Sequence, residues 1–216
     1  MRLVALAIVF SCARAWAGDC TAELDARHVS WKKASIPPPR VNRDGSVLVP
    51  GIALPVEITG PIGGIELTSE DQPLVIDCSL AVSLDEAGRY LRALGITKAN
   101  FASAYSRRKV RFTDHWSKHS FGLAIDISTF SGPDLGTLRV DRDFEQGLGD
   151  EMDCVGEPLT QAGAVLEILK CQLVRSGLFH LVLSPDYDDA HHDHFHLEAK
   201  PWAERTELRS TLPAIH

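Results

Sequence analysis

The chain has 216 residues, of which 44% are hydrophobic and 24% are charged, with 12 prolines and 16 glycines. This composition is that of one globular domain, or at most two small ones, and it excludes collagen-like, coiled-coil and wholly disordered proteins. The formal net charge of −7 argues against a protein that binds nucleic acid by neutralising phosphates, so no nucleic-acid partner is expected. Histidine is the outlier, because four of the nine histidines lie between His191 and His196.

The first 17 residues are typical of a secretory signal peptide. Met1-Arg2 is basic, Leu3 to Phe10 is apolar, and Ala15-Trp16-Ala17 has the small-residue pattern of a cleavage site. We expect cleavage after Ala17 and export from the cytoplasm. A buried N-terminal helix and a lipoprotein signal that ends at Cys12 are the alternatives. No transmembrane segment is expected, because the apolar run is shorter than the about 20 residues that a bilayer span needs and no later segment is long enough.

The first half of the mature chain indicates a surface arm, short strands and one helix. Residues 18–43 are polar and contain Pro37-Pro38-Pro39, which predicts an extended arm. Short β-rich segments at 46–49 and 55–58 are separated by glycine and proline, which predicts strands and turns. Ser83 and Glu86 have the spacing of a capping box, so a helix is predicted to begin at Ser83 and to end at Gly95.

The second half mixes strands and helices. Apolar periodicity and turn residues predict strands at 100–105, 123–127, 178–183 and 195–198, a hairpin around 137–140 and a helix over 159–176. Strands and helices do not alternate regularly, so an α+β fold is predicted rather than a doubly wound sheet. The predicted organisation is a signal peptide over 1–17, the arm over 18–43, one domain over 44–200 and a tail over 201–216.

Four cysteines remain after the predicted cleavage, namely Cys20, Cys78, Cys154 and Cys171. An even number of cysteines in an exported protein predicts two disulfides, for which three pairings exist. Cys20 with Cys78 and Cys154 with Cys171 is the favoured pairing, because each bond closes a loop of moderate length. The sequence by itself leaves the pairing open.

Two segments carry the residues for chemistry: SKHSFGLAID at 117–126 and HHDHFH at 191–196. Neither contains the helical H-E-x-x-H motif, which excludes a thermolysin-like site. Asp126 lies in an apolar strand and needs a partner, and His119 lies just before the preceding turn. His194 and His196 are two residues apart, so in a strand they project to the same side. Imidazole, carboxylate and imidazole from neighbouring segments predict a zinc site with three protein ligands and a fourth position open for water, as in catalytic zinc sites.

These residues form a pattern that resembles the LAS metallopeptidases, which comprise lysostaphin-like enzymes, D-alanyl-D-alanine peptidases and the hedgehog signalling domain. The pattern is S-x-H-x-x-G-x-A-x-D followed by H-x-H. The layout from Cys20 to Glu198 is closer still to the bacterial extensin-like C-terminal domain family, with proline-rich N-terminal residues, a strand containing tyrosine, and a D-H-F-H ending. The resemblance implies a small antiparallel sheet that carries the metal site and is flanked by helices, as in the hedgehog and D-Ala-D-Ala peptidase folds.

The resemblance also implies metal ligands. His119, Asp126 and His196 match the zinc ligands of these families. His194 matches the first histidine of H-x-H, which lies beside the metal and is assigned to the catalytic group. The alternatives are a buried His119–Asp126 ion pair that fixes a turn, and a His194 that only hydrogen-bonds a neighbour of the metal site.

Two further roles follow from the same resemblance. His191 matches an additional histidine of the murein endopeptidases and is a candidate general base, with a solvated loop residue as the alternative. Arg108 matches the strand arginine that faces the scissile carbonyl in the carboxypeptidases, where a guanidinium stabilises the oxyanion. Arg107 could replace it, and a surface cation is the alternative for Arg108.

The chain departs from these families at two points. The carboxypeptidases place a glutamate base shortly before the last ligand, and positions 188–195 contain no glutamate. Extensin-like domains have a cysteine just before the arginine, where this chain has Arg107, so one disulfide partner could have moved to Cys154.

The predicted function is an exported, monomeric zinc peptidase of the periplasm that hydrolyses amide bonds in peptidoglycan peptide stems, with zinc-bound water as the nucleophile. It is a murein endopeptidase or a D,D- or L,D-carboxypeptidase, and its partner is peptidoglycan or a muropeptide. One alternative is a non-catalytic, zinc-containing module that binds cell wall or polysaccharide. Another is a structural zinc fold in which His194 completes four protein ligands.

Overall fold

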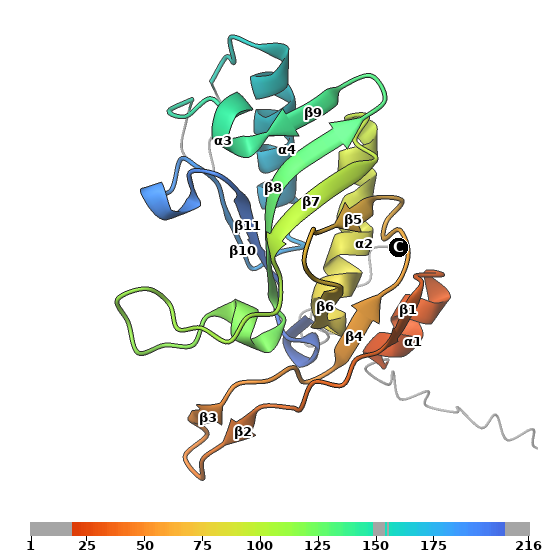
Figure 1. The fold of residues 1–216 in the computed structure, drawn as a ribbon, viewed down its shortest axis with the longest axis vertical. Coiled ribbons are helices and arrows are strands. Elements are labelled where there is room, and N and C mark those ends of the chain that lie inside the picture. Colours follow the sequence, from red (N-terminus) through yellow and green to blue (C-terminus); the bar gives the residue numbers. More distant parts are fainter. Residues whose placement is uncertain (1–18, 149–153, 155, 206–216) are drawn as a thin grey trace, which may run out of the picture.

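The computed structural model describes residues 19–148, 154 and 156–205 (Figure 1). The predicted signal peptide and residues 206–216 of the predicted tail lie outside these ranges. Small sheets and a few helices make up the described chain, which confirms the α+β class. In the ranges given above, no helix has both the length and the apolar character needed to cross a membrane.

Six strands form the main sheet, and its centre carries the predicted site. Their order is β10 (Leu181–Leu183), β11 (Phe195–Glu198), β8 (Ala124–Gly132), β7 (Lys98–Ser103) and β5 (Glu66–Thr68), with β9 (Gly136–Arg139) also paired to β8. Neighbouring strands are antiparallel except β5 and β7, which are parallel. The predicted antiparallel sheet is therefore correct around the site and wrong at the β5 edge, where the chain returns through a helix between the two strands.

The described part of the predicted arm, residues 19–43, begins with a helix and is not extended throughout. Residues 20–26 form helix α1 (Cys20–Ala26), which begins at the Asp19 carboxylate where the backbone N–H of Thr21 donates over 3.0 Å. The chain then forms β1 (Trp31–Lys33), which joins β4 (Pro55–Ile58) and β6 (Leu74–Asp77) in an antiparallel sheet. The cap and the strand pairing give this polar segment the backbone partners that an extended arm lacks. Further along, β2 (Arg40–Val41) pairs with β3 (Val47–Val49) and projects from the body as a hairpin (Figure 1).

The helix predicted from Ser83 begins five residues earlier. Helix α2 (Cys78–Ala93) has Asp77 as its N-cap, whose carboxylate accepts from the backbone N–H of Ser79 at 2.9 Å. The hydroxyl of Ser83 is buried inside the helix and donates to the carbonyl of Leu178 at 2.9 Å. The capping-box pattern therefore misplaced the start, because the serine hydroxyl is used in a tertiary contact.

The remaining helices are short except one. Helix α4 (Gln161–Ser176) begins two residues after the start of the predicted segment 159–176 and ends at Gly177 as predicted. The others are α3 (Val140–Asp143) and the 3-10 helices η1 (Lys118–Phe121) and η2 (Asp189–His191). Both favoured disulfides are confirmed: one joins Cys20 to Cys78 and so ties α1 to α2, and the other joins Cys154 to Cys171 of α4.

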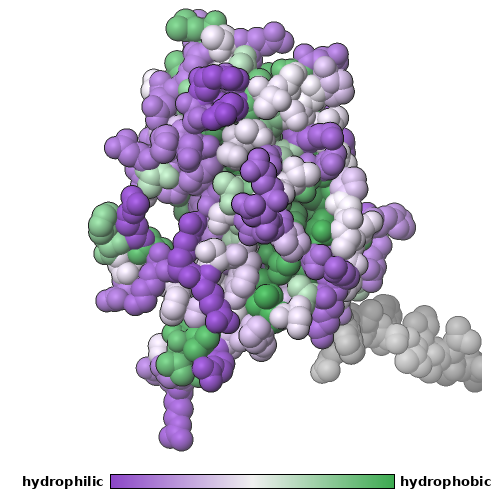
Figure 2. All heavy atoms as spheres, viewed as in Figure 1, coloured by the Kyte–Doolittle hydropathy of each residue, from purple (hydrophilic) through white to green (hydrophobic). Residues whose placement is uncertain are grey.

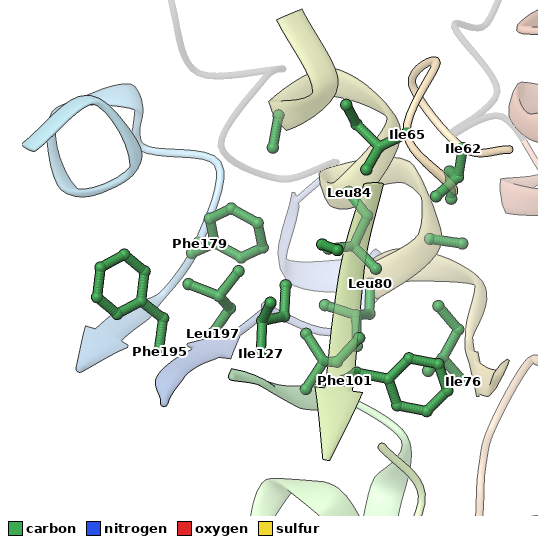
Figure 3. Packing of buried hydrophobic residues seen from close by; sticks show 14 of the residues in the cluster. Ile62, Ile65, Ile76, Leu80, Leu84, Phe101, Ile127, Phe179, Phe195 and Leu197 are labelled. Carbon is green, nitrogen blue, oxygen red and sulfur yellow. The ribbon is translucent and has the colours of Figure 1, made fainter. Parts of the chain in front are cut away.

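The hydrophobic core lies between the main sheet and helices α2 and α4, which cover one face of the sheet (Figure 1). Ile127 of β8 and Leu197 of β11 gather there with Leu80 and Leu84 of α2 (Figure 3). Burial of one such side chain contributes about 1.5–3 kcal/mol to stability. Because side chains alternate along a strand, this packing leaves Asp126 on the opposite face of β8.

Candidate metal centre

A tight turn between η1 and β8 brings His119 and Asp126 together. The Ser117 hydroxyl caps η1 by accepting from the backbone N–H of His119 at 3.3 Å. Gly122 follows with φ of +66°, and a Cβ atom there would lie 2.8 Å from the backbone nitrogen of Asp77. Glycine is therefore needed both for the backbone conformation and for the close approach. The turn places the start of β8 directly behind His119.

Strand pairing adds the third residue. In the register of β8 and β11, His196 lies directly opposite Asp126. The Oδ1 atom of Asp126 lies 2.7 Å from Nδ1 of His196 and 3.1 Å from Nε2 of His119, and these two nitrogens are 3.3 Å apart. All three side chains are buried. The structure thus brings the three predicted zinc ligands together, with one donor atom of each facing a common point.

The outward nitrogens of both histidines have hydrogen-bond acceptors. The Nδ1–H of His119 donates to the carbonyl of Ala104 at 2.6 Å, and the Nε2–H of His196 donates to Oε1 of Glu198 at 3.0 Å. Metal-bound histidines usually have such partners, which fix the tautomer and leave the inward nitrogen free for the metal. Tetrahedral zinc bonds of about 2.0–2.1 Å place ligand atoms about 3.3 Å apart. The types of donor atom fit a zinc ion, and so do the two spacings of 3.1 and 3.3 Å, whereas the Asp126–His196 spacing of 2.7 Å is that of a hydrogen bond and would have to widen around the metal.

The charges of the three groups are strongly coupled. Burial opposes ionisation of Asp126, but hydrogen bonds with His119 and His196 hold the pKa of this carboxyl well below its usual range. Burial also disfavours the charged form of His196. The hydrogen bonds of His196 with Asp126 and Glu198 outweigh this effect of burial and raise the pKa of the ring to about 9. A proton and a divalent cation would therefore compete for Nδ1 of His196.

The histidine loop closes over the exposed side of the centre. Nε2 of His194 lies 3.4 Å from Oδ1 of Asp126, and its other ring nitrogen lies 2.7 Å from the Asp193 carboxylate. The Nδ1 atom of His191 lies 2.6 Å from the Asp188 carboxylate, and its ring lies 5.2 Å from that of His194. Both side chains remain partly exposed, at 18% for His191 and 15% for His194, so they form the solvent side of the site.

Arg108 reaches the centre and Arg107 does not. The Nη2 atom of Arg108 donates to Oδ2 of Asp126 at 3.1 Å, so the two carboxylate oxygens have different partners. About half of the Arg108 side chain stays exposed. The Nε–H of Arg107 instead donates to the Tyr105 hydroxyl at 3.1 Å. Asp126 therefore has the charged partners that its burial requires.

Two acidic residues of the site were missed in the sequence. Glu198 follows His196 by two positions, so strand alternation alone places both on one face of β11 and could have indicated the contact. Asp188 precedes His191 by three positions, at the N-cap of η2. Burial opposes ionisation of Asp188, but its bond with His191 holds the pKa of this carboxyl below its usual value.

Fold and site together define an α+β protein with a buried His–Asp–His centre on its main sheet. The family model described as Extensin-like protein C-terminus matches residues 19–208. The chain therefore belongs to this family, as predicted from its motifs. Comparisons with curated proteins and with solved structures found no match.

Proposed function

We propose that the chain is a zinc-dependent peptidase that acts on the peptide stems of the cell wall. The observation that carries the proposal is the convergence of His119 Nε2, Asp126 Oδ1 and His196 Nδ1 within 3.3 Å of one another. When bound, zinc would supply a Lewis acid and a water nucleophile at neutral pH. The resemblance to LAS enzymes supplies the substrate class, and two disulfides agree with export to an oxidising compartment such as the periplasm.

The residues around the centre would have different roles in amide hydrolysis. His191 accepts the proton of the attacking water at Nε2, because its Nδ1–H is held by the Asp188 carboxylate. The ring of His194 lines the same side and helps to orient the reacting groups. The half-exposed guanidinium of Arg108 stabilises negative charge on the scissile carbonyl oxygen, while its bond to Asp126 keeps it in place.

The test is to incubate the mature protein with purified muropeptides, with and without a chelator, and to identify products by mass spectrometry. The proposal predicts new termini that appear only without chelator. His191→Ala should abolish cleavage while the protein keeps its zinc. The matched control is His192→Ala, because His192 is exposed and its Nδ1 atom bonds to a backbone carbonyl, that of Asp189 at 2.7 Å, rather than to a residue of the site.

A non-catalytic, zinc-containing wall-binding module is the second candidate. It is favoured by one observation: positions 188–195 contain no glutamate, and Glu198 nearby is engaged by His196. A module of this kind would bind wall material, release no new termini and be indifferent to His191→Ala. The muropeptide experiment therefore separates the two candidates.

A further inference from the structure

A hairpin beside the candidate metal centre is exposed along almost all of its length. Residues 107–116 double back through a bridge between Lys109 and Trp116 and a hydrogen bond of 2.9 Å from the N–H of Val110 to the carbonyl of His115. All nine residues from 107 to 115 are exposed. Figure 1 shows this segment, here called the 107–116 hairpin, projecting from the body just before η1.

The 107–116 hairpin is basic in an acidic chain. It contains four cationic residues and one acidic residue, whereas the whole chain has a formal net charge of −7. Arg108 is paired with Asp126, and Lys109 is paired with Asp114 at 2.8 Å. Arg107 and Arg111 form no ion pair with any residue that the structure describes. Two exposed guanidinium groups are thus available to an anionic ligand.

The tip of the hairpin exposes an aromatic ring. The Phe112 side chain is 98% exposed, and Val110 beside it is 47% exposed. Phe112 also has φ of +62°, a left-handed conformation that is strained for a bulky residue. Figure 2 shows hydrophobic atoms at the outer end of this projecting segment, with hydrophilic side chains around them. Backbone strain of this kind clusters at binding and functional sites, and a fully exposed ring contributes nothing to the core, so together they favour a binding role for Phe112.

Hydrogen bonds join the hairpin to the metal centre. The N–H of Ser106 donates to the carbonyl of His119 at 3.2 Å, and the N–H of Arg108 donates to the Ser120 hydroxyl at 2.9 Å. The Arg108 guanidinium continues to Asp126. A ligand on the hairpin would therefore lie next to the residues that we propose for catalysis.

We propose that the 107–116 hairpin holds an anionic wall polymer, a glycopeptide that carries carboxylates, beside the metal centre. Arg107 and Arg111 pair with the carboxylates, and Phe112 packs against the C–H face of a sugar ring. This inference rests on the proposed function and adds the surface that selects the substrate. An anionic membrane fits less well, because only two of nine exposed residues are apolar, which is little for insertion into a bilayer.

The test measures sedimentation of the mature protein with purified peptidoglycan sacculi, in the His191→Ala background so that the wall is not digested. A second sample uses sacculi whose carboxyl groups have been amidated. We expect salt-sensitive binding that is lost on amidation. The double substitution Arg107→Glu with Arg111→Glu should weaken binding about tenfold, and Phe112→Ala should weaken it severalfold. Circular dichroism shows whether each variant is folded.

The matched control is Arg40→Glu with Arg43→Glu, which makes the same charge change on the projecting β2–β3 hairpin. The control variant should bind sacculi within about twofold of the protein that keeps Arg40 and Arg43. Exposed charges far from a ligand are screened by salt and rarely change its affinity by more than this. Equal binding of amidated sacculi, equal losses in both double variants, or sedimentation only with phosphatidylglycerol vesicles would overturn the inference. Binding without cleavage by the chain that retains His191 would instead refute only the proposed peptidase activity.

Discussion

Glu198 should control how tightly the centre holds zinc. Its Oε1 atom accepts from Nε2 of His196 at 3.0 Å, and its side chain is only 15% exposed. Loss of such a partner typically weakens metal binding 10–100-fold, which is about 1.4–2.7 kcal/mol. We therefore expect Glu198→Ala to raise the dissociation constant for zinc by this factor. Glu198→Gln should cost less, because the amide oxygen can still accept the bond.

The pH dependence separates metal binding from proton competition. His196 has a pKa of about 9 in the metal-free protein, so zinc must displace a proton from it at neutral pH. The apparent affinity of the unaltered protein should rise by up to about tenfold per pH unit and level off near pH 9. In Glu198→Ala one of the two bonds that raise this pKa is absent, so the affinity should level off at lower pH.

The assay is competition with a chromophoric chelator at pH 7.5 and pH 9.5. Glu70→Ala is the control, because Glu70 is an exposed carboxylate on the loop between β5 and β6. At pH 9.5 proton competition no longer compensates for the lost bond, so equally tight zinc binding by Glu198→Ala and the unaltered protein at this pH would show that Glu198 does not support the centre.

Three further predictions concern stability. Burial raises the pKa of Asp77 to about 6, above its unfolded value. Ionisation of Asp77 should therefore lower the free energy of unfolding by up to about 3 kcal/mol as pH rises from 4 to 7. Urea denaturation across this range should show that loss in the unaltered protein and not in Asp77→Asn. Lys170 is 1% exposed and paired with two carboxylates, so Lys170→Met should lower the free energy of unfolding by about 3–5 kcal/mol. Lys98 belongs to an exposed pair, so Lys98→Met should lower it by less than about 1 kcal/mol. Equal losses in the two variants would contradict this prediction. Removal of the Cys20–Cys78 bond, which spans 58 residues, should lower the free energy of unfolding by about 4 kcal/mol. Removal of the Cys154–Cys171 bond, which spans 17 residues, should lower it by about 3 kcal/mol. Calorimetry of the serine variants measures both losses, and a larger loss for the second bond would contradict the prediction.

Elements whose signals are local could be predicted from the sequence. Strand β11 has the predicted bounds, because apolar Phe195 and Leu197 alternate with His196 and Glu198. Helix α4 ends at Gly177 with φ of +66°, a backbone conformation that glycine adopts without strain. Both signals depend only on residues within the element.

Elements that depend on distant contacts were misplaced. Ser83 has the spacing of a helix cap, yet its hydroxyl bonds to Leu178, 95 positions away, and Asp77 caps the helix instead. Helix α1 is short and is held to α2 by the Cys20–Cys78 bond. Seven residues form a marginal helix by themselves, so propensity alone could not reveal it.

The candidate site could be predicted only in part, because some of its signals are local and others depend on distant contacts. The spacing of His119 and Asp126 around a glycine turn, together with an H-x-H strand, indicated a site with two imidazoles and a carboxylate, and the family resemblance selected His196 as the third ligand. The structure brings these three residues together. The division of the Asp126 oxygens between the histidines and Arg108 depends on the fold of the 107–116 hairpin. No pattern in the sequence indicates that contact.

The most direct measurement is the zinc content of the purified mature protein, determined by mass spectrometry of the metal after reconstitution and removal of free ion. We expect one zinc per chain in the unaltered protein and in His180→Ala, whose histidine is exposed just before β10. A folded His119→Ala variant should hold none. A reconstituted protein without zinc, or a His119→Ala variant that retains a full equivalent, would contradict it.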